Sequence, residues 1–204
     1  MAETNPNARL EAFSDGVFAI AITLLVLEIK LPPEESITTT RDFWVALLGI
    51  LPSIVTFLLS FTIILITWVN HHAAFQLIHK SSGAFIYANG FLLLAVVFLP
   101  LPTGLLGEYV LTNHAAPAVV LFDGVQAVQA CGWVLVMRAA IRNGLARNES
   151  CMVQLRESLK FGYYGVAIYS TCAIAAFWFP LLIAIATTII WAGWLIVGTT
   201  IRRE

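Results

Sequence analysis

Long uncharged stretches alternate with short charged segments along this chain. No Lys, Arg, Asp or Glu occurs from Phe43 to His79, or in the 41 residues from Phe161 to Ile201. At a helical rise of about 1.5 Å per residue, the second stretch reaches ~60 Å, which is two crossings of a ~30 Å hydrocarbon core. Pro180 follows the aromatic run that begins at Phe177, and aromatic side chains favour the membrane interface. The pattern therefore predicts a turn near Pro180.

Five strong membrane spans follow from this pattern. They cover approximately 43–69, 84–106, 116–137, 161–179 and 181–201. A sixth candidate near the N-terminus is unusual, because its uncharged part runs only from Gly16 to Leu27, whereas a span needs ~20 apolar residues. One interpretation is a short interfacial helix. We favour a helix over about 9–31 that crosses inside the protein, since charges within a membrane normally face a bundle interior or water.

Basic side chains give the orientation of six such spans. If the N-terminus is inside, nine basic residues lie on the cytoplasmic side: Arg9, Lys80, Arg138, Arg142, Arg147, Arg156, Lys160, Arg202 and Arg203. The outer loops then hold only Lys30 and Arg41. Positive charge is enriched in cytoplasmic loops. The sequence predicts a multi-pass protein of the cell (inner) membrane with both termini in the cytoplasm.

Composition excludes several classes of protein. Apolar residues make up 59% of the 204 residues and charged residues 11%, against about 25% charged in soluble domains. The mean hydropathy of +0.86 and the net charge of −1 exclude a disordered chain and a basic nucleic-acid binder. Cys131, Cys151 and Cys172 form no metal-binding spacing, and no nucleophile–base pair or phosphate loop is visible. We predict one transmembrane domain over 1–204, no enzymatic activity, no cofactor and no bound metal.

Polar residues recur at one depth near the cytoplasmic ends of three predicted spans. Ser14 and Asp15 open the first, Trp68 and His71 end the second, and Asn89 lies one turn into the third. Ser14 and Asp15 alone are explained by helix N-capping. Because polar groups in hydrocarbon require partners, a hydrogen-bonded layer of all five is also predicted. Such a layer is either structural or, through His71, sensitive to protons.

Above that layer, the first span carries a stripe of residues on one helical face. Ile20, Leu24, Leu27 and Leu31 lie at helical spacing, and Thr23 shares their face. A stripe of this kind is typical of a packing core. If several copies of the helix surround an axis, it instead forms stacked apolar rings of a hydrophobic gate, with a ring of Thr23 hydroxyls.

The chain resembles the transmembrane protein 175 family of potassium-permeable channels. The likeness lies in Arg9-x-x-x-Phe13-Ser14-Asp15 before an apolar helix, in Trp68-Val-Asn70-His71, and in Asn89 with the segment 98–103. One repeat is present, as in prokaryotic forms. The resemblance implies a homotetramer whose central pore is lined by the first helix of each subunit.

The resemblance also implies roles for individual residues. Ile20 corresponds to the narrowest ring, Thr23 or Leu24 to the next layer, and Leu27 to the outermost one. A second set braces the pore helix: Arg9, Phe13, Ser14, Asp15, Trp68, Asn70, His71 and Asn89. From its charge, Glu28 is expected to attract cations at the outer pore mouth.

Two functions remain open from the sequence. The first is a passive potassium-permeable cation channel. Its permeant ion is K⁺, and its partners are other copies of the same chain and membrane lipid. The alternative is a proton-coupled secondary transporter or a proton-leak channel, although the inverted repeats typical of transporters are missing. Asp123, Gln126 and Gln129 lie outside the family motif and form either an inward polar patch or a subunit contact.

Overall fold

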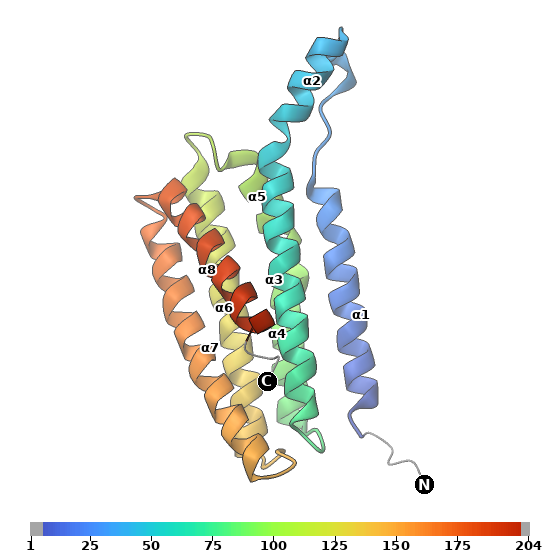
Figure 1. Ribbon diagram of the computed structural model, residues 1–204, viewed down its shortest axis with the longest axis vertical. Helices are drawn as coiled ribbons and strands as arrows, with labels where there is room; N and C mark the ends of the chain where they lie inside the picture. The colour runs from blue at the N-terminus through green and yellow to red at the C-terminus, as the bar shows by residue number, and fades with distance from the viewer. Residues whose placement is uncertain (1–5, 201–204) are drawn as a thin grey trace.

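The computed structural model describes residues 6–200, apart from the side chains of Ser36 and 197–200. It confirms the prediction of an all-helical protein (Figure 1). The long helices are α1 (Ala8–Leu24), α3 (Leu51–Gln76), α4 (Gly83–Phe98), α6 (Ala115–Arg142), α7 (Glu149–Ala175) and α8 (Pro180–Thr200). The shorter elements are η1 (Leu25–Glu28), η2 (Glu34–Ser36), α2 (Thr40–Gly49) and α5 (Pro100–Tyr109). Residues 201–203, which include two of the counted arginines, lie outside the described residues.

The first helix ends in a tighter turn than expected. Its α-helical part stops at Leu24, a 3₁₀ turn continues to Glu28, and the backbone becomes extended at Ile29. Pro32 and Pro33 follow, and a residue before proline is pushed away from helical angles. The helix expected to reach residue 31 therefore ends at Glu28.

Two of the predicted spans are each built from two helices. The second begins in α2, which has a Thr39–Asp42 capping box and no buried residue, and Pro52 opens α3 behind it. The third breaks between α4 and α5 at Pro100, which cannot donate a backbone hydrogen bond. In Figure 1, α2 stands above the rest of the bundle.

Two loops meet at the lower end of the molecule in Figure 1. The α3–α4 and α6–α7 turns form a short antiparallel bridge, in which the His79 N–H donates to the Leu145 carbonyl at 3.0 Å. The Arg147 side chain donates to the Ile78 carbonyl at 3.0 Å. Gly144 has φ +60°, a left-handed conformation that suits glycine after a helix. This bridge fixes the two hairpins relative to one another.

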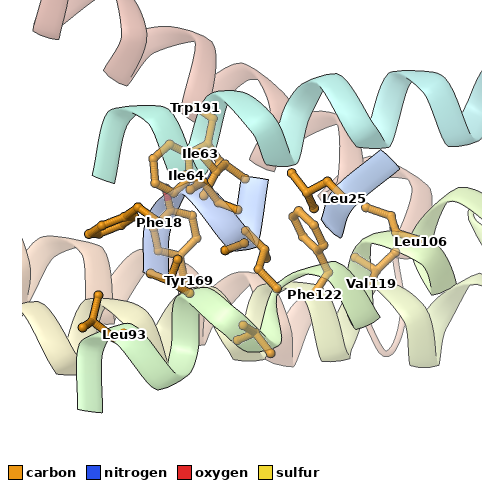
Figure 2. Close-up of a cluster of buried hydrophobic side chains, with 14 of the residues drawn as sticks. Phe18, Leu25, Ile63, Ile64, Leu93, Leu106, Val119, Phe122, Tyr169 and Trp191 are labelled. Atoms are coloured by element: carbon orange, nitrogen blue, oxygen red, sulfur yellow. The ribbon is translucent and has the colours of Figure 1, made fainter. Parts of the chain in front are cut away.

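The apolar core runs through the middle of the bundle (Figure 2). Phe18 of α1, Ile63 and Ile64 of α3, and Phe122 of α6 are all buried there. Tyr169 of α7 and Trp191 of α8 stack with ring centroids 5.6 Å apart. Close contacts between backbones complete the packing: a Cβ on Gly132 of α6 would lie 2.8 Å from the Leu92 Cα of α4.

Within residues 6–200, four stretches have the length and composition needed to cross a membrane. They are Ala8–Glu28, Thr40–Gln76, Gly83–Tyr109 and Ala115–Arg142. The helix α7 begins with polar turns, and the described apolar part of α8, Pro180–Ile196, is shorter than the other spans. Ala8–Glu28 is the least buried of the four, because only 22% of its apolar 18-residue segment is covered by the rest of the subunit. In Figure 1, α1 stands at one side of the bundle.

Candidate functional site

The helix α1 presents two different faces. Ser14, Phe18, Ala21 and Leu25 follow one another at spacings of four, three and four residues, and all are buried. This spacing places them on one stripe of an α-helix. Within α1 the stripe packs against α3 and α4, and its continuation in η1, where Leu25 lies, packs against α5. One face of α1 is therefore fully used by contacts within the subunit.

The opposite face of α1 is not covered by the chain itself. Ile20 is 59% exposed, Leu24 38% and Leu27 72%. Thr23 lies exposed among them, and its hydroxyl donates to the Ile20 carbonyl at 2.9 Å. The hydroxyl hydrogen is thus engaged with the backbone, while the oxygen keeps an acceptor lone pair for other groups. The result is a continuous apolar face interrupted by one hydroxyl oxygen.

Glu28 lies apart from this exposed face. It is half-buried, and its carboxyl group packs against Gly104 of α5, where a Cβ would displace it. The 3₁₀ turn over Leu25–Glu28 has three residues per turn instead of 3.6, which rotates Glu28 away from the register of α1. The structure thus directs the expected pore-mouth carboxylate toward its own subunit.

An ion pair fixes the segment beyond this turn. Lys30 pairs with Glu108 of α5, and both side chains are exposed. The hydrogen bond and charge of Glu108 raise the pKa of Lys30 above its usual 10.5. An exposed pair of this kind adds little stability, but it joins the loop after α1 to the end of α5.

A chain of hydrogen bonds crosses three helices at the start of α1. The Ser14 hydroxyl donates to the Leu10 carbonyl at 2.8 Å, and the Asn89 Nδ2 donates to the Ser14 Oγ at 3.0 Å. The Asn89 Oδ1 lies 2.7 Å from the His71 Nε2. Because an amide oxygen only accepts, the His71 Nε2 carries the proton. Ser14, His71 and Asn89 are all buried, so this chain is closed to solvent.

A second link joins α1 to α3 beside this chain. The Trp68 Nε1 donates to the Asp15 Oδ1 at 2.8 Å, and the Trp68 ring stacks on His72. Phe18 packs edge-on against His71, with ring centroids 5.3 Å apart. The structure therefore brings together the five polar residues that the sequence places at one depth of the membrane.

Three other predicted bracing residues lie away from this layer. Arg9 and Phe13 are on the exposed side of α1, with Phe13 62% exposed. Asn70 faces a cavity toward α6, α7 and α8. Across the described residues no group of three His, Cys, Asp or Glu side chains is placed to hold a metal ion.

Polar pairs deeper in the bundle were only partly visible in the sequence. The Thr187 hydroxyl of α8 donates to the Asp123 Oδ1 at 2.8 Å, and the Gln129 Nε2 donates to the Thr67 Oγ1 at 2.9 Å. Asp123 and Gln129 stand out as polar residues in an apolar span. Their threonine partners do not, because threonine is common in membrane helices and no fixed spacing connects residues 62 and 64 positions apart.

These features define a class of protein. Apolar helices of spanning length enclose polar side chains that are paired across helices, and one helix keeps a long exposed face. Membrane proteins satisfy buried polar groups internally in this way. The fold is that of a multi-pass, membrane-embedded helical protein.

Comparison with known proteins identifies the family. The family model described as "Endosomal/lysosomal potassium channel TMEM175" matches residues 9–100, which contain α1 through α4. A protein from Chryseobacterium sp. (strain P1-3) named as a potassium channel is 35% identical over 179 residues, covering 87% of this chain and 85% of the relative. The chain belongs to the TMEM175 family. That family is one of ion channels and not of enzymes.

Two further similarities are to proteins from Chamaesiphon minutus. A protein named as a potassium channel is 50% identical over 123 residues, a match that spans 60% of each chain. The crystal structure of a lysosomal potassium-selective channel TMEM175 homolog from the same organism superposes with a TM-score of 0.85 at 34% identity. That superposition covers 96% of this chain and 99% of the other. The family assignment therefore extends to the helices beyond residue 100.

Proposed function

We propose that this chain is a subunit of a homotetrameric, potassium-permeable cation channel that conducts passively. The observation that carries the proposal is the division of α1 into a packed face and an exposed face. Of the four spans found among the described residues, Ala8–Glu28 is also the least buried within the subunit, as expected for a helix whose remaining partners come from other subunits. Four copies around an axis would cover the exposed face and line a pore with it. The relatives named as potassium channels support the choice of ion.

The chemistry of this face suits a hydrophobic gate. Rings of Ile20, Leu24 and Leu27 would form apolar constrictions, which gate by dewetting. Ile20 is proposed as the narrowest ring, with the Thr23 oxygens as the next polar layer. Since apolar rings replace little of an ion's hydration shell, selectivity for K⁺ over Na⁺ should be modest. No cofactor or bound metal enters the proposal beyond the permeant K⁺.

The hydrogen-bonded layer gives these rings a fixed position. Ser14 and Asp15 attach α1 to α4 and α3 one to two turns before Ile20. A pore diameter depends on the rotation of each lining helix, so this attachment supports a bracing role for the layer. Arg9, Phe13 and Asn70 are proposed to add to it across the assembled tetramer.

The charge distribution supports an orientation. Nine basic residues, two of them beyond residue 200, lie in the segments assigned to one side and two in those assigned to the other. We place the tetramer in the cell (inner) membrane with both termini in the cytoplasm.

The test is Ile20→Asn in purified protein reconstituted into planar bilayers. An amide in the narrowest ring should hydrate it, which raises single-channel conductance several-fold and moves the K⁺/Na⁺ bi-ionic reversal potential toward zero. The matched control is Ile174→Asn near the end of α7, where the isoleucine is 61% exposed against 59% for Ile20. The control should leave both quantities unchanged. Equal conductance and reversal potential in Ile20→Asn and wild type would refute the pore-lining assignment.

A further inference from the structure

A cavity lies inside the subunit, away from the exposed face of α1. It has a volume of about 120 Å³, and its walls come from α3, α4, α6, α7 and α8. On α3 the cavity is lined by Ile66, Thr67 and Asn70, while the neighbouring Trp68 turns toward Asp15 of α1. The helix α3 therefore separates this space from the proposed pore.

The cavity wall carries buried polar atoms that are left unpaired. Gln126 is 1% exposed, and neither its Oε1 nor its Nε2 has a hydrogen-bond partner within residues 6–200. The same holds for the Oε1 of Gln129 and the Nε1 of Trp191. Gln129 is held in place because its Nε2 donates to the Thr67 hydroxyl. Two donors and two acceptors thus lie around one space.

Leaving these atoms unpaired would be costly. A buried polar group without a partner costs about 1–3 kcal/mol, so four such atoms would offset much of the stability of a domain. An apolar occupant such as a lipid chain would not remove that cost. Water supplies both donors and acceptors, and ~120 Å³ holds roughly four molecules at about 30 Å³ each.

A route for water leads to the cavity from the end of the bundle. A groove of about 500 Å³ shares Ile66, Asn70, Trp133, Phe161 and Trp194 with the cavity. It continues past polar side chains at the last turn of α3 and the first turns of α7: Gln76, Gln154, Glu157 and Ser158. The inner cavity and the polar groove therefore lie next to each other and share these five wall residues.

We propose that each subunit contains a hydrated vestibule, separate from the α1 face, which holds a small water cluster on Gln126, Gln129 and Trp191. Water enters it through the groove between α3, α6, α7 and α8. The vestibule carries water to within one helical turn of Asp123, whose Oδ1 accepts from Thr187. The proposal does not depend on ion conduction along α1.

Radiolytic hydroxyl-radical footprinting with mass spectrometry tests this on the protein reconstituted in lipid nanodiscs. Radicals formed from bound water oxidise the aromatic rings beside it. After correction for intrinsic side-chain reactivity, Trp191 should oxidise at least fivefold faster than Phe122, although the two side chains are only 7% and 1% exposed. Equal corrected rates would mean a dry or lipid-filled cavity and would overturn the proposal.

A pair of leucine substitutions tests the role of the amides. Gln126→Leu keeps a similar volume but removes the polar atoms, and it should lower Trp191 oxidation at least threefold. Thr171→Leu, at an exposed position of α7 outside both the cavity and the groove, is the control and should leave that rate unchanged. If Gln126→Leu fails to fold, Gln129→Leu replaces it with the same expected loss. An unchanged Trp191 rate in the folded inner variant would contradict the assignment, whatever the channel recordings show.

Discussion

Asn89 makes both side-chain hydrogen bonds that close the chain between α1 and α3. Its Nδ2 donates to the Ser14 Oγ, and its Oδ1 accepts from the His71 Nε2. Each atom of the amide thus serves a different helix. All three side chains are buried, so no solvent replaces a lost partner. A single residue therefore determines whether this chain of hydrogen bonds is complete.

Replacing Asn89 with alanine should destabilise the subunit more than Ser14→Ala. The Asn89→Ala variant leaves the buried His71 N–H unpaired and removes the donor to the Ser14 oxygen, which keeps its own bond to the Leu10 carbonyl. The cost should be about 2 kcal/mol, which corresponds to a midpoint roughly 4–8 °C lower for a chain of this size. Ser14→Ala leaves the Asn89 Nδ2 without its acceptor but keeps the bond between Asn89 and His71, so its loss should be about half as large. Thermal unfolding of the detergent-solubilised protein measures both. Equal midpoints for Asn89→Ala and wild type would contradict the closed chain of hydrogen bonds.

At this scale the sequence was informative where polar residues are rare. Asn89 and Trp68 stand out in apolar spans, and their common depth was enough to predict the layer. Glu28 shows the limit of such reasoning. Its charge suggested a role at the outer pore mouth, which stays a prediction, but it did not indicate that the carboxyl group lies against Gly104 after a change from α to 3₁₀ geometry. An argument from sequence periodicity assumes 3.6 residues per turn along the whole helix. It therefore does not detect a four-residue segment in which the helix tightens to 3₁₀ geometry.

Among the elements, proline positions decide where the spans bend. Pro52 and Pro100 lie in the first turns of α3 and α5, where a missing N–H costs least. The uncharged stretches of the sequence predict helices in these regions, but they do not indicate where a helix bends or is interrupted. How closely helices approach depends on glycines, which an average hydropathy also does not reveal.

Gly132 permits the contact between α4 and α6. A Cβ there would lie 2.8 Å from the Leu92 Cα, and a backbone atom does not move aside as a flexible side chain does. We therefore expect Gly132→Ala to lower the free energy of unfolding by about 1–3 kcal/mol, as overpacking does. Gly124→Ala on the same helix is the control, because its Cβ would meet nothing within 4 Å.

Thermal unfolding in one detergent compares the two α6 variants. Gly124→Ala should equal or slightly exceed wild type, since alanine favours a helix by up to ~1 kcal/mol over glycine. A loss of stability in both variants, or in neither, would show that the approach of α4 to α6 is not what requires Gly132.

For the whole molecule, the alternating helices place the α3–α4 and α6–α7 turns at the same end (Figure 1). The backbone bridge between them confirms that these two loops meet. Because both loops carry basic residues, they also define the side expected to face the cytoplasm. Sequence alone assigned the sides by counting charges. It did not show that the two basic loops touch, since the bridge between them is a pairing of backbone groups that no residue pattern encodes.

Cysteine labelling in intact cells distinguishes the two possible orientations. Cys151 lies in the first turn of α7 at the basic end, and with Cys131→Ser and Cys172→Ser it becomes the single cysteine. A membrane-impermeant maleimide should react with it only after the cells are lysed. Glu35→Cys, at the exposed opposite end and in a background without the three native cysteines, should react fully in intact cells. The reverse pattern would mean that the basic loops face outward, and would thus contradict a cytoplasmic opening of the groove that leads to Gln126.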